Sequence, residues 1–88
     1  MEKRTITVKN KTGLHARPAA LFVQTAGKFL SEITVKKDDK EVNAKSIMGI
    51  MALGVSQGNE ITIIARGEDE KEAVEALVDL LENKLIEE

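Results

Sequence analysis

The chain has 88 residues, of which 42% are hydrophobic and 32% charged, and its formal net charge at pH 7 is −2. This size and composition predict a single globular domain over residues 1–88 and exclude a disordered chain. Without cysteine, a run of about 20 apolar residues or a signal peptide, the chain offers no disulfide framework, thiolate zinc site or membrane span, and we expect a cytoplasmic protein.

The first predicted element is a strand over residues 3–9, because polar and apolar residues alternate there and Ile6 and Val8 fall on one face. Residues 10–14 form the turn that follows, and Gly13 permits a sharp bend of the backbone. This turn leads into a helix.

The predicted helix begins with His15, Ala16 and Arg17, runs to about Ala26 and stops at Gly27. The proline after Arg17 suits the first helical turn, because it lacks an N–H group. The apolar face consists of the residues at helical spacing, which are Ala19, Phe22, Val23, Ala26 and Leu30.

Two short strands and a second helix follow. Residues 32–36 form a strand, residues 37–40 a polar turn, and residues 41–44 an edge strand that pairs back. Ser46 is a favoured N-cap residue, and the short helix after it covers residues 47–52 and ends at a glycine.

The fourth strand is predicted over residues 60–66, and Asp69-x-x-Glu72 resembles a capping box that opens the last helix. The apolar stripe of this helix consists of Val74, Leu77, Val78, Leu81 and Leu85. Helices with one apolar stripe and strands with one apolar face predict a two-layer α+β sandwich.

The start of the first helix carries the residues best suited to chemistry. The first N–H groups of a helix have no intrahelical partner and carry partial positive charge, so they favour anions, phosphate above all. His15 is a poor N-cap, and its neutral imidazole is a nucleophile. Arg17 supplies a guanidinium that fits phosphate oxygens. These residues predict a histidine that accepts a phosphoryl group, although a surface histidine without a role fits the same pattern.

The segment Gly13-Leu14-His15-Ala16-Arg17-Pro18-Ala19 resembles the active-site signature of HPr, the histidine phosphocarrier family of the bacterial phosphoenolpyruvate:sugar phosphotransferase system (PTS). A second block, Lys45 to Gly54, resembles the regulatory-serine segment of that family. The resemblance covers essentially the whole chain. It implies an open-faced sandwich in which a four-stranded antiparallel sheet carries three helices on one face.

The resemblance further implies a phosphocarrier that is not an enzyme and needs no cofactor or metal. It would accept a phosphoryl group from Enzyme I on Nδ1 of His15 and pass it to sugar-specific IIA domains. The backbone N–H groups of Ala16 and Arg17 and the Arg17 side chain would lie near the phosphate. His15 separates the chain from the regulatory paralogue in which this histidine is replaced. A nitrogen-branch phosphocarrier is the alternative, and we expect a monomer.

Ser46 has two compatible interpretations. As an N-cap it would stabilise the second helix by about 1 kcal/mol. The resemblance implies that HPr kinase/phosphorylase also phosphorylates it and that the product binds a catabolite-control repressor. Phosphorylation would add about −1.5 to −2 charges at pH 7.

The short helix also carries a candidate docking surface. We expect Ile47, Met48 and Met51 to be partly exposed, because methionine adapts to irregular partner surfaces, and Ile50 and Leu53 to be buried. The alternative places both methionines in the core. The resemblance implies that Ala20, Ile47, Met48 and Met51 contact Enzyme I, the IIA domains and the kinase.

Charge is unevenly distributed, since residues 1–45 carry ten Lys/Arg and five Asp/Glu and residues 46–88 carry three and ten. A positive surface near His15 would attract an acidic partner, although solvated faces explain single charges equally well. The basic half also fits a small nucleic-acid-binding domain, but Phe22 and Phe29 are the only aromatic residues, so we expect no nucleic acid. A single histidine without cysteine provides no metal cluster.

Overall fold

The structure, a computed structural model, describes residues 1–85. The last three positions of the expected domain, 86–88, lie outside the described residues. The elements in chain order are β1 (Glu2–Thr7), α1 (Ala16–Ala26), β2 (Glu32–Lys37), β3 (Lys40–Asn43), α2 (Ile47–Leu53), β4 (Glu60–Arg66), α3 (Glu70–Asp79) and a π-helical turn, Leu80–Lys84.

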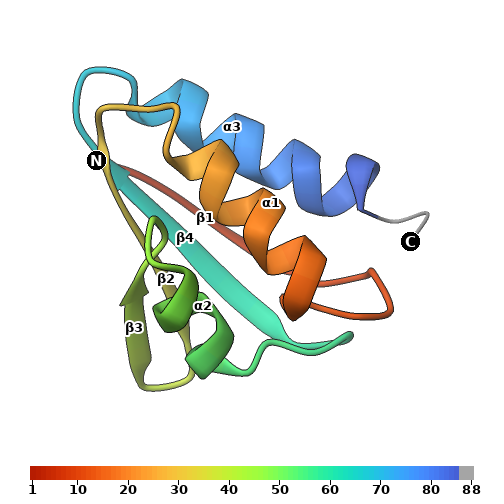
Figure 1. Ribbon diagram of the computed structural model, residues 1–88. Coiled ribbons are helices and arrows are strands. Elements are labelled where there is room, and N and C mark those ends of the chain that lie inside the picture. Colours follow the sequence, from red (N-terminus) through yellow and green to blue (C-terminus); the bar gives the residue numbers. More distant parts are fainter. Residues whose placement is uncertain (86–88) are drawn as a thin grey trace.

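The four strands form one antiparallel sheet in the order β1-β4-β2-β3, and the three helices cover one of its faces (Figure 1). This confirms the predicted α+β sandwich and the fold implied by the resemblance. β4 therefore pairs with β1 on one side and with β2 on the other. Among residues 1–85, no helix combines the length and apolarity that crossing a bilayer requires.

The core lies between the sheet and the helices. Strand residues alternate as predicted: in β4, Ile61, Ile63 and Ala65 are buried, whereas Thr62 and Ile64 on the open face are half-buried. From the helices, the fully buried side chains include Phe22 of α1, Ile50 of α2 and Leu77 of α3. Burying such side chains stabilises a fold by about 1.5–3 kcal/mol each.

Two predictions about α1 are wrong. The helix begins at Ala16, and His15 is its N-cap residue with extended φ and ψ of −114° and 151°. Leu30 does not belong to its apolar face, because the helix ends at Ala26, Gly27 closes it, and the Leu30 side chain is 89% exposed. The spacing that includes Leu30 therefore extends past the last helical turn.

The first strand also differs from the prediction, since it begins at Glu2 and ends at Thr7. Val8 is nevertheless buried, and its backbone pairs with the loop before β4, donating to the Asn59 carbonyl at 2.8 Å and accepting from Gly58 N–H at 2.8 Å. The predicted alternation thus continues past the end of the strand.

The capping-box prediction is wrong. Asp69 occupies the N-cap position of α3, but its side chain makes no capping bond. Its Oδ2 instead accepts from the Leu30 N–H at 2.8 Å, and its Oδ1 accepts from the Ser31 N–H at 3.0 Å and from the Ser31 hydroxyl. Asp69 therefore ties the loop before β2 to the start of α3.

These contacts change the acidity of two carboxyl groups. The Ser31 hydroxyl, followed by the Leu30 N–H, lowers the pKa of Asp69 from its usual value of 3.8. The Met1 ammonium, 2.8 Å from Glu70, and the Gly67 N–H lower the pKa of Glu70 from its usual value of 4.5. Both groups lie at the start of α3.

Candidate functional site

The turn before α1 is fixed by contacts with its own residues and with the loop after α2. Gly13 N–H donates to the Asn10 carbonyl at 3.2 Å, and Leu14 N–H donates to the Val55 carbonyl at 3.1 Å. Gly13 has φ of +59°, and a Cβ atom there would lie 2.2 Å from the Val55 carbonyl oxygen. This position therefore requires glycine, as the sequence suggested.

His15 is the first exposed residue after this turn. Leu14 is fully buried, whereas the residues at positions 15, 16 and 17 are exposed. The His15 side chain makes no capping bond to the helix. Within residues 1–85, the amides of Ala16 and Arg17 donate to no backbone or side-chain acceptor, because they precede the first intrahelical bonds. An exposed imidazole thus lies next to two free N–H donors.

Ala16 adopts a backbone conformation that the sequence did not reveal. Its φ is +49°, in the left-handed region. For a residue with a Cβ atom this conformation costs about 1–2 kcal/mol. It places a strained residue directly after His15.

The Arg17 side chain is exposed and available. The ion pairs found within the described part of the chain are Met1 with Glu70 and Lys84 with Asp79, so the Arg17 guanidinium takes part in none. A free guanidinium two residues after His15 suits an anionic ligand.

Ser46 caps α2, which confirms the structural half of its prediction. Its Oγ accepts from the Gly49 N–H at 3.1 Å. At the other end, Gly54 closes the helix with φ of +71°, and the Lys37 ammonium donates to the Gly54 carbonyl at 2.8 Å. No sequence pattern points to Lys37, because this bond joins residues 17 positions apart.

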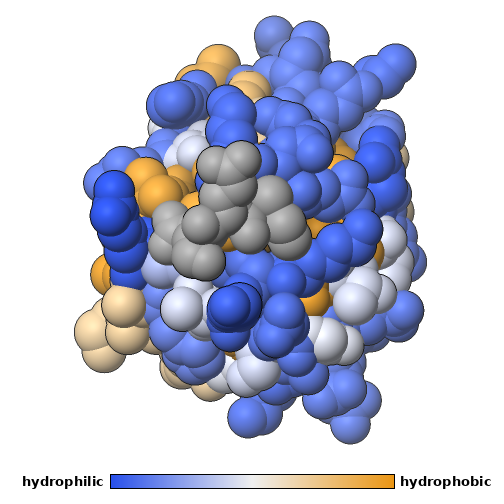
Figure 2. Space-filling model, turned by 90° about the vertical axis from the view of Figure 1, so that its right-hand side faces the viewer, coloured by the Kyte–Doolittle hydropathy of each residue, from blue (hydrophilic) through white to orange (hydrophobic). Residues whose placement is uncertain are grey.

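Three residues of α2 form an exposed apolar surface, as predicted. Ile47, Met48 and Met51 are 39%, 78% and 45% exposed, whereas Ile50 and Leu53 are buried. The helix packs against α1, on which Ala20 is half-buried. We call Ala20, Ile47, Met48 and Met51 the α1–α2 patch. By contrast, the side of the molecule shown in Figure 2 is mostly hydrophilic.

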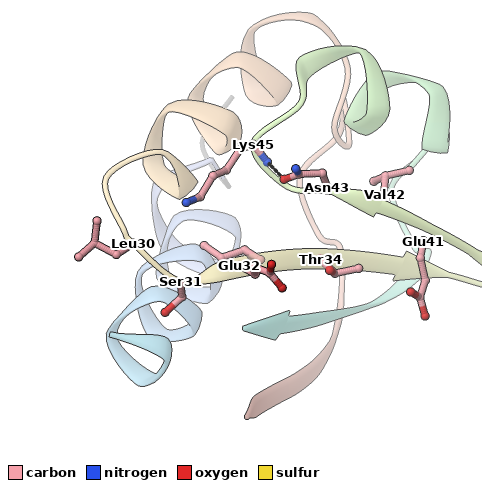
Figure 3. A pocket seen from close by; sticks show the side chains of 9 residues that line it. Leu30, Ser31, Glu32, Thr34, Glu41, Val42, Asn43 and Lys45 are labelled. Carbon is pink, nitrogen blue, oxygen red and sulfur yellow. Dashed lines mark hydrogen bonds between the residues drawn. The ribbon is translucent and has the colours of Figure 1, made fainter. Parts of the chain in front are cut away.

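A groove of about 500 Å³ lies elsewhere, along the start of β2 and the end of β3. Figure 3 shows its side chains spread along the two strands, with Leu30 pointing away from them. Because these side chains do not converge on one point and His15 is not among them, the groove does not compete with the His15 region as the candidate site.

Known proteins resemble this chain over most of its length. Residues 2–83 match the family model described as PTS HPr component phosphorylation site. Two relatives are named HPr-like protein Crh. The one from Halalkalibacterium halodurans is 56% identical over 84 residues, which cover 96% of this chain and 100% of the relative. The one from Bacillus subtilis is 60% identical over 77 residues, which cover 88% and 91%.

Among solved structures, HPr-C-His from Thermoanaerobacter tengcongensis is 68% identical, with a TM-score of 0.95 and coverage of 100% of this chain and 98% of the other. An HPr dimer from the same organism is 69% identical, with a TM-score of 0.78 and coverage of 97% and 98%. Crh from Bacillus subtilis, described as a catabolite repression protein and a dimer with a swapping domain, is 57% identical, with a TM-score of 0.74 and coverage of 92% and 93%.

The expectation of a monomer conflicts with the last two structures, because both relatives are dimers. The other comparisons support the resemblance to the HPr family. With a family model that matches nearly the whole chain and relatives above 50% identity, the chain belongs to the HPr family, whose members are phosphocarrier proteins and not enzymes.

Proposed function

We propose that this chain is a cytoplasmic phosphocarrier of the PTS, acting as one domain without a cofactor. It accepts a phosphoryl group on His15 from phospho-Enzyme I and passes that group to sugar-specific IIA domains. The observation that carries the proposal is the exposed, non-capping His15 at the start of α1, beside the free amides of Ala16 and Arg17.

In the transfer step, Nδ1 of the neutral His15 imidazole attacks phosphorus, and the N–P bond forms as the bond to the donor in Enzyme I breaks. The helix terminus stabilises the phosphoryl oxygens by about 0.3–1 kcal/mol. A charge-assisted bond from Arg17 adds about 1.5–3 kcal/mol. These moderate energies suit a carrier, because a phosphoryl group held more tightly would not be passed on to a IIA domain.

Docking of Enzyme I and the IIA domains is assigned to the α1–α2 patch. Its exposed methionines are flexible and polarisable, so one surface can fit several partners. The free Arg17 guanidinium lies in the sequence between His15 and the patch residue Ala20 and adds positive charge for an acidic partner.

The test is incubation with phosphoenolpyruvate and Enzyme I, followed by intact-mass measurement. The wild-type chain should gain one phosphoryl group, which acid removes, and His15→Ala should gain none. Because His15 is the only histidine, this single substitution is decisive. A wild-type chain that remains unlabelled, or an H15A chain that carries an acid-labile group, would contradict the proposal.

A second function, regulation through Ser46, is favoured by the similarity to Crh from Bacillus subtilis, which is described as a catabolite repression protein. In this scheme HPr kinase/phosphorylase phosphorylates Ser46 and the product binds a catabolite-control repressor. Incubation with the kinase and ATP should label the wild-type and H15A chains and leave Ser46→Ala unlabelled. Labelling of Ser46 combined with no labelling from phosphoenolpyruvate would make the chain a regulator and not a carrier.

A further inference from the structure

Asn10 is a buried polar residue at the base of the turn that leads to His15. Its side chain is 1% exposed. Ser31 is the other polar residue found buried among residues 1–85, and its hydroxyl bonds to Asp69. By contrast, Oδ1 of Asn10 is the buried side-chain atom that lacks a hydrogen-bond partner in this part of the chain. An unpaired buried acceptor calls for an explanation.

Asn10 holds the turn from both sides. Its Nδ2 donates to the Gly13 carbonyl at 2.8 Å, and its own backbone carbonyl accepts from the Gly13 N–H at 3.2 Å. The next residue, Leu14, is fixed by its bond to the Val55 carbonyl. The direction in which the backbone reaches His15 is therefore set by Asn10 together with the loop after α2.

The energetics indicate that this asparagine is not needed for stability. A hydrogen bond such as the one from Nδ2 contributes little net stability, whereas an unpaired buried acceptor costs at least as much as such a bond contributes. The side chain thus costs the fold about as much as it contributes. A small apolar residue would remove the unpaired Oδ1 but leave the Gly13 carbonyl without this donor, so one unpaired acceptor would replace another and stability would change little. The substitution would, however, remove the N–H group that fixes the position of the Gly13 carbonyl.

We propose that Asn10 is a positioning residue for phosphoryl transfer at His15, an inference that rests on the proposed carrier function. By fixing the Gly13 carbonyl, Asn10 directs the imidazole toward the free amides of Ala16 and Arg17. The left-handed φ of +49° at Ala16 supports this role. Such a strained conformation persists only where the backbone on both sides is fixed, here by the turn and by α1.

The test compares Asn10→Ala with Asn43→Ala. Asn43 is a matched control, because its side chain also makes one loop bond, accepting from the Lys45 N–H at 2.8 Å, but it lies on β3. N10A should lower kcat for phosphorylation by Enzyme I about tenfold, as expected for a displaced reacting group, with KM unchanged because the α1–α2 patch is intact. Both variants should unfold within a few degrees of the wild-type Tm.

Two further measurements separate this inference from the carrier function. Phosphoramidate phosphorylates histidine without Enzyme I: its P–N bond breaks with release of ammonia as the bond from phosphorus to His15 forms. Nuclear Overhauser contacts between the His15 ring and the Ala16 and Arg17 amides report ring position without any phosphate. N10A should weaken these contacts and slow the phosphoramidate reaction, and N43A should change neither.

Wild-type contacts and kinetics retained in N10A would overturn the role of Asn10, whether or not Enzyme I phosphorylates the chain. The role of Asn10 would also be overturned if the slower reaction of N10A came only from a fraction of unfolded protein. If the wild-type chain reacts with phosphoramidate but not with Enzyme I, the carrier function fails while the N10A contacts still decide the role of Asn10.

Discussion

The His15 imidazole is free to react because the backbone of the turn is fixed by the neighbouring residues and not by the His15 side chain. Gly13 and Leu14 attach the turn to Val55, so the imidazole is free of structural hydrogen bonds and exposed. A serine or aspartate at this position would bond to the helix amides and occupy the proposed anion site. His15 departs from the usual N-cap preference for Ser, Thr, Asp or Asn, and this departure leaves the helix amides free at the candidate site.

Gly13→Ala should strongly destabilise the fold. The added Cβ would lie 2.2 Å from the Val55 carbonyl oxygen, and φ of +59° is strained for alanine. We expect a loss of about 2 kcal/mol or more, which corresponds to a Tm lower by roughly 10 °C. Gly58→Ala is the matched control, because it also has positive φ but its Cβ would meet no atom within 4 Å. Thermal unfolding that is equal for the two variants would show that the contact with Val55 is unimportant.

At the scale of elements, α2 is a short helix stabilised at both ends. Ser46 caps its N-terminus, while Gly54 and the Lys37 ammonium satisfy its C-terminus. A helix of seven residues is not stable by itself in water, so these contacts and the packing on α1 hold the exposed patch in place. A change of charge or of hydrogen bonding at either end of α2 therefore acts directly on the α1–α2 patch, the proposed docking surface.

Substitutions of Ser46 should separate its two roles. Ser46→Ala removes the bond to Gly49 N–H and should lower the free energy of unfolding by about 1 kcal/mol. Ser46→Asp keeps a capping acceptor, so its stability should stay near that of the wild type, but its negative charge beside the patch should raise KM for Enzyme I. Denaturant titration and transfer kinetics check both results. An S46D chain with wild-type KM would argue against regulation through this residue.

The Asp69 contacts predict a pH dependence of stability. The pKa of Asp69 is lowered in the folded chain, chiefly by the Ser31 hydroxyl, so the ionised form stabilises the fold. This contribution is complete above the unfolded value of 3.8 and is lost as the pH falls below it through the folded pKa. Asp69→Asn should lower Tm near pH 7 and flatten the acid side of the Tm profile. Glu70→Gln is a comparison, because Glu70 has a lowered pKa with different partners. Identical acid profiles for D69N and the wild type would contradict this account.

The sequence predicted the elements better than their contacts. Periodicity placed the two long helices and most of the strands, since apolar spacing reflects which face of an element is buried. The cap at Ser46 and the glycine at position 54 placed the short helix. Two local patterns gave wrong predictions: the capping box at Asp69 and the apolar spacing that includes Leu30. Asp69 bonds to Ser31 instead of capping its own helix, and Leu30 continues an apolar spacing after the helix has ended. The left-handed Ala16 left no sequence signal, because alanine has no preference for that conformation.

At the scale of the whole molecule, strand order and charge distribution could not be read from periodicity. The order β1-β4-β2-β3 depends on pairings between segments far apart in the sequence. The uneven charge was visible, and the structure adds that Lys9, Lys11 and Arg17, which flank His15 in the sequence, are exposed. The opposite charge gathers on α3, where Glu72, Glu75 and Asp79 are exposed.

This distribution predicts that transfer from Enzyme I depends on salt. Exposed charges are screened over about 10 Å at 0.1 M salt and about 3 Å at 1 M, so kcat/KM should fall with ionic strength while kcat changes little. Lys11→Gln should reduce the salt dependence. Lys40→Gln, which removes an equal charge from the start of β3, should leave the salt dependence unchanged. A kcat/KM that does not respond to salt would exclude electrostatic steering.

The central position of β4 has a consequence for biosynthesis. Both β1 and β2 pair with β4, Glu60–Arg66, which follows both of them in the sequence, so β1 and β2 remain unjoined until this segment has been made. A nascent chain that stops before Glu60 exposes the apolar faces of both strands and cannot assemble the sheet. The sheet of this protein can therefore be completed only after β4 has left the ribosome.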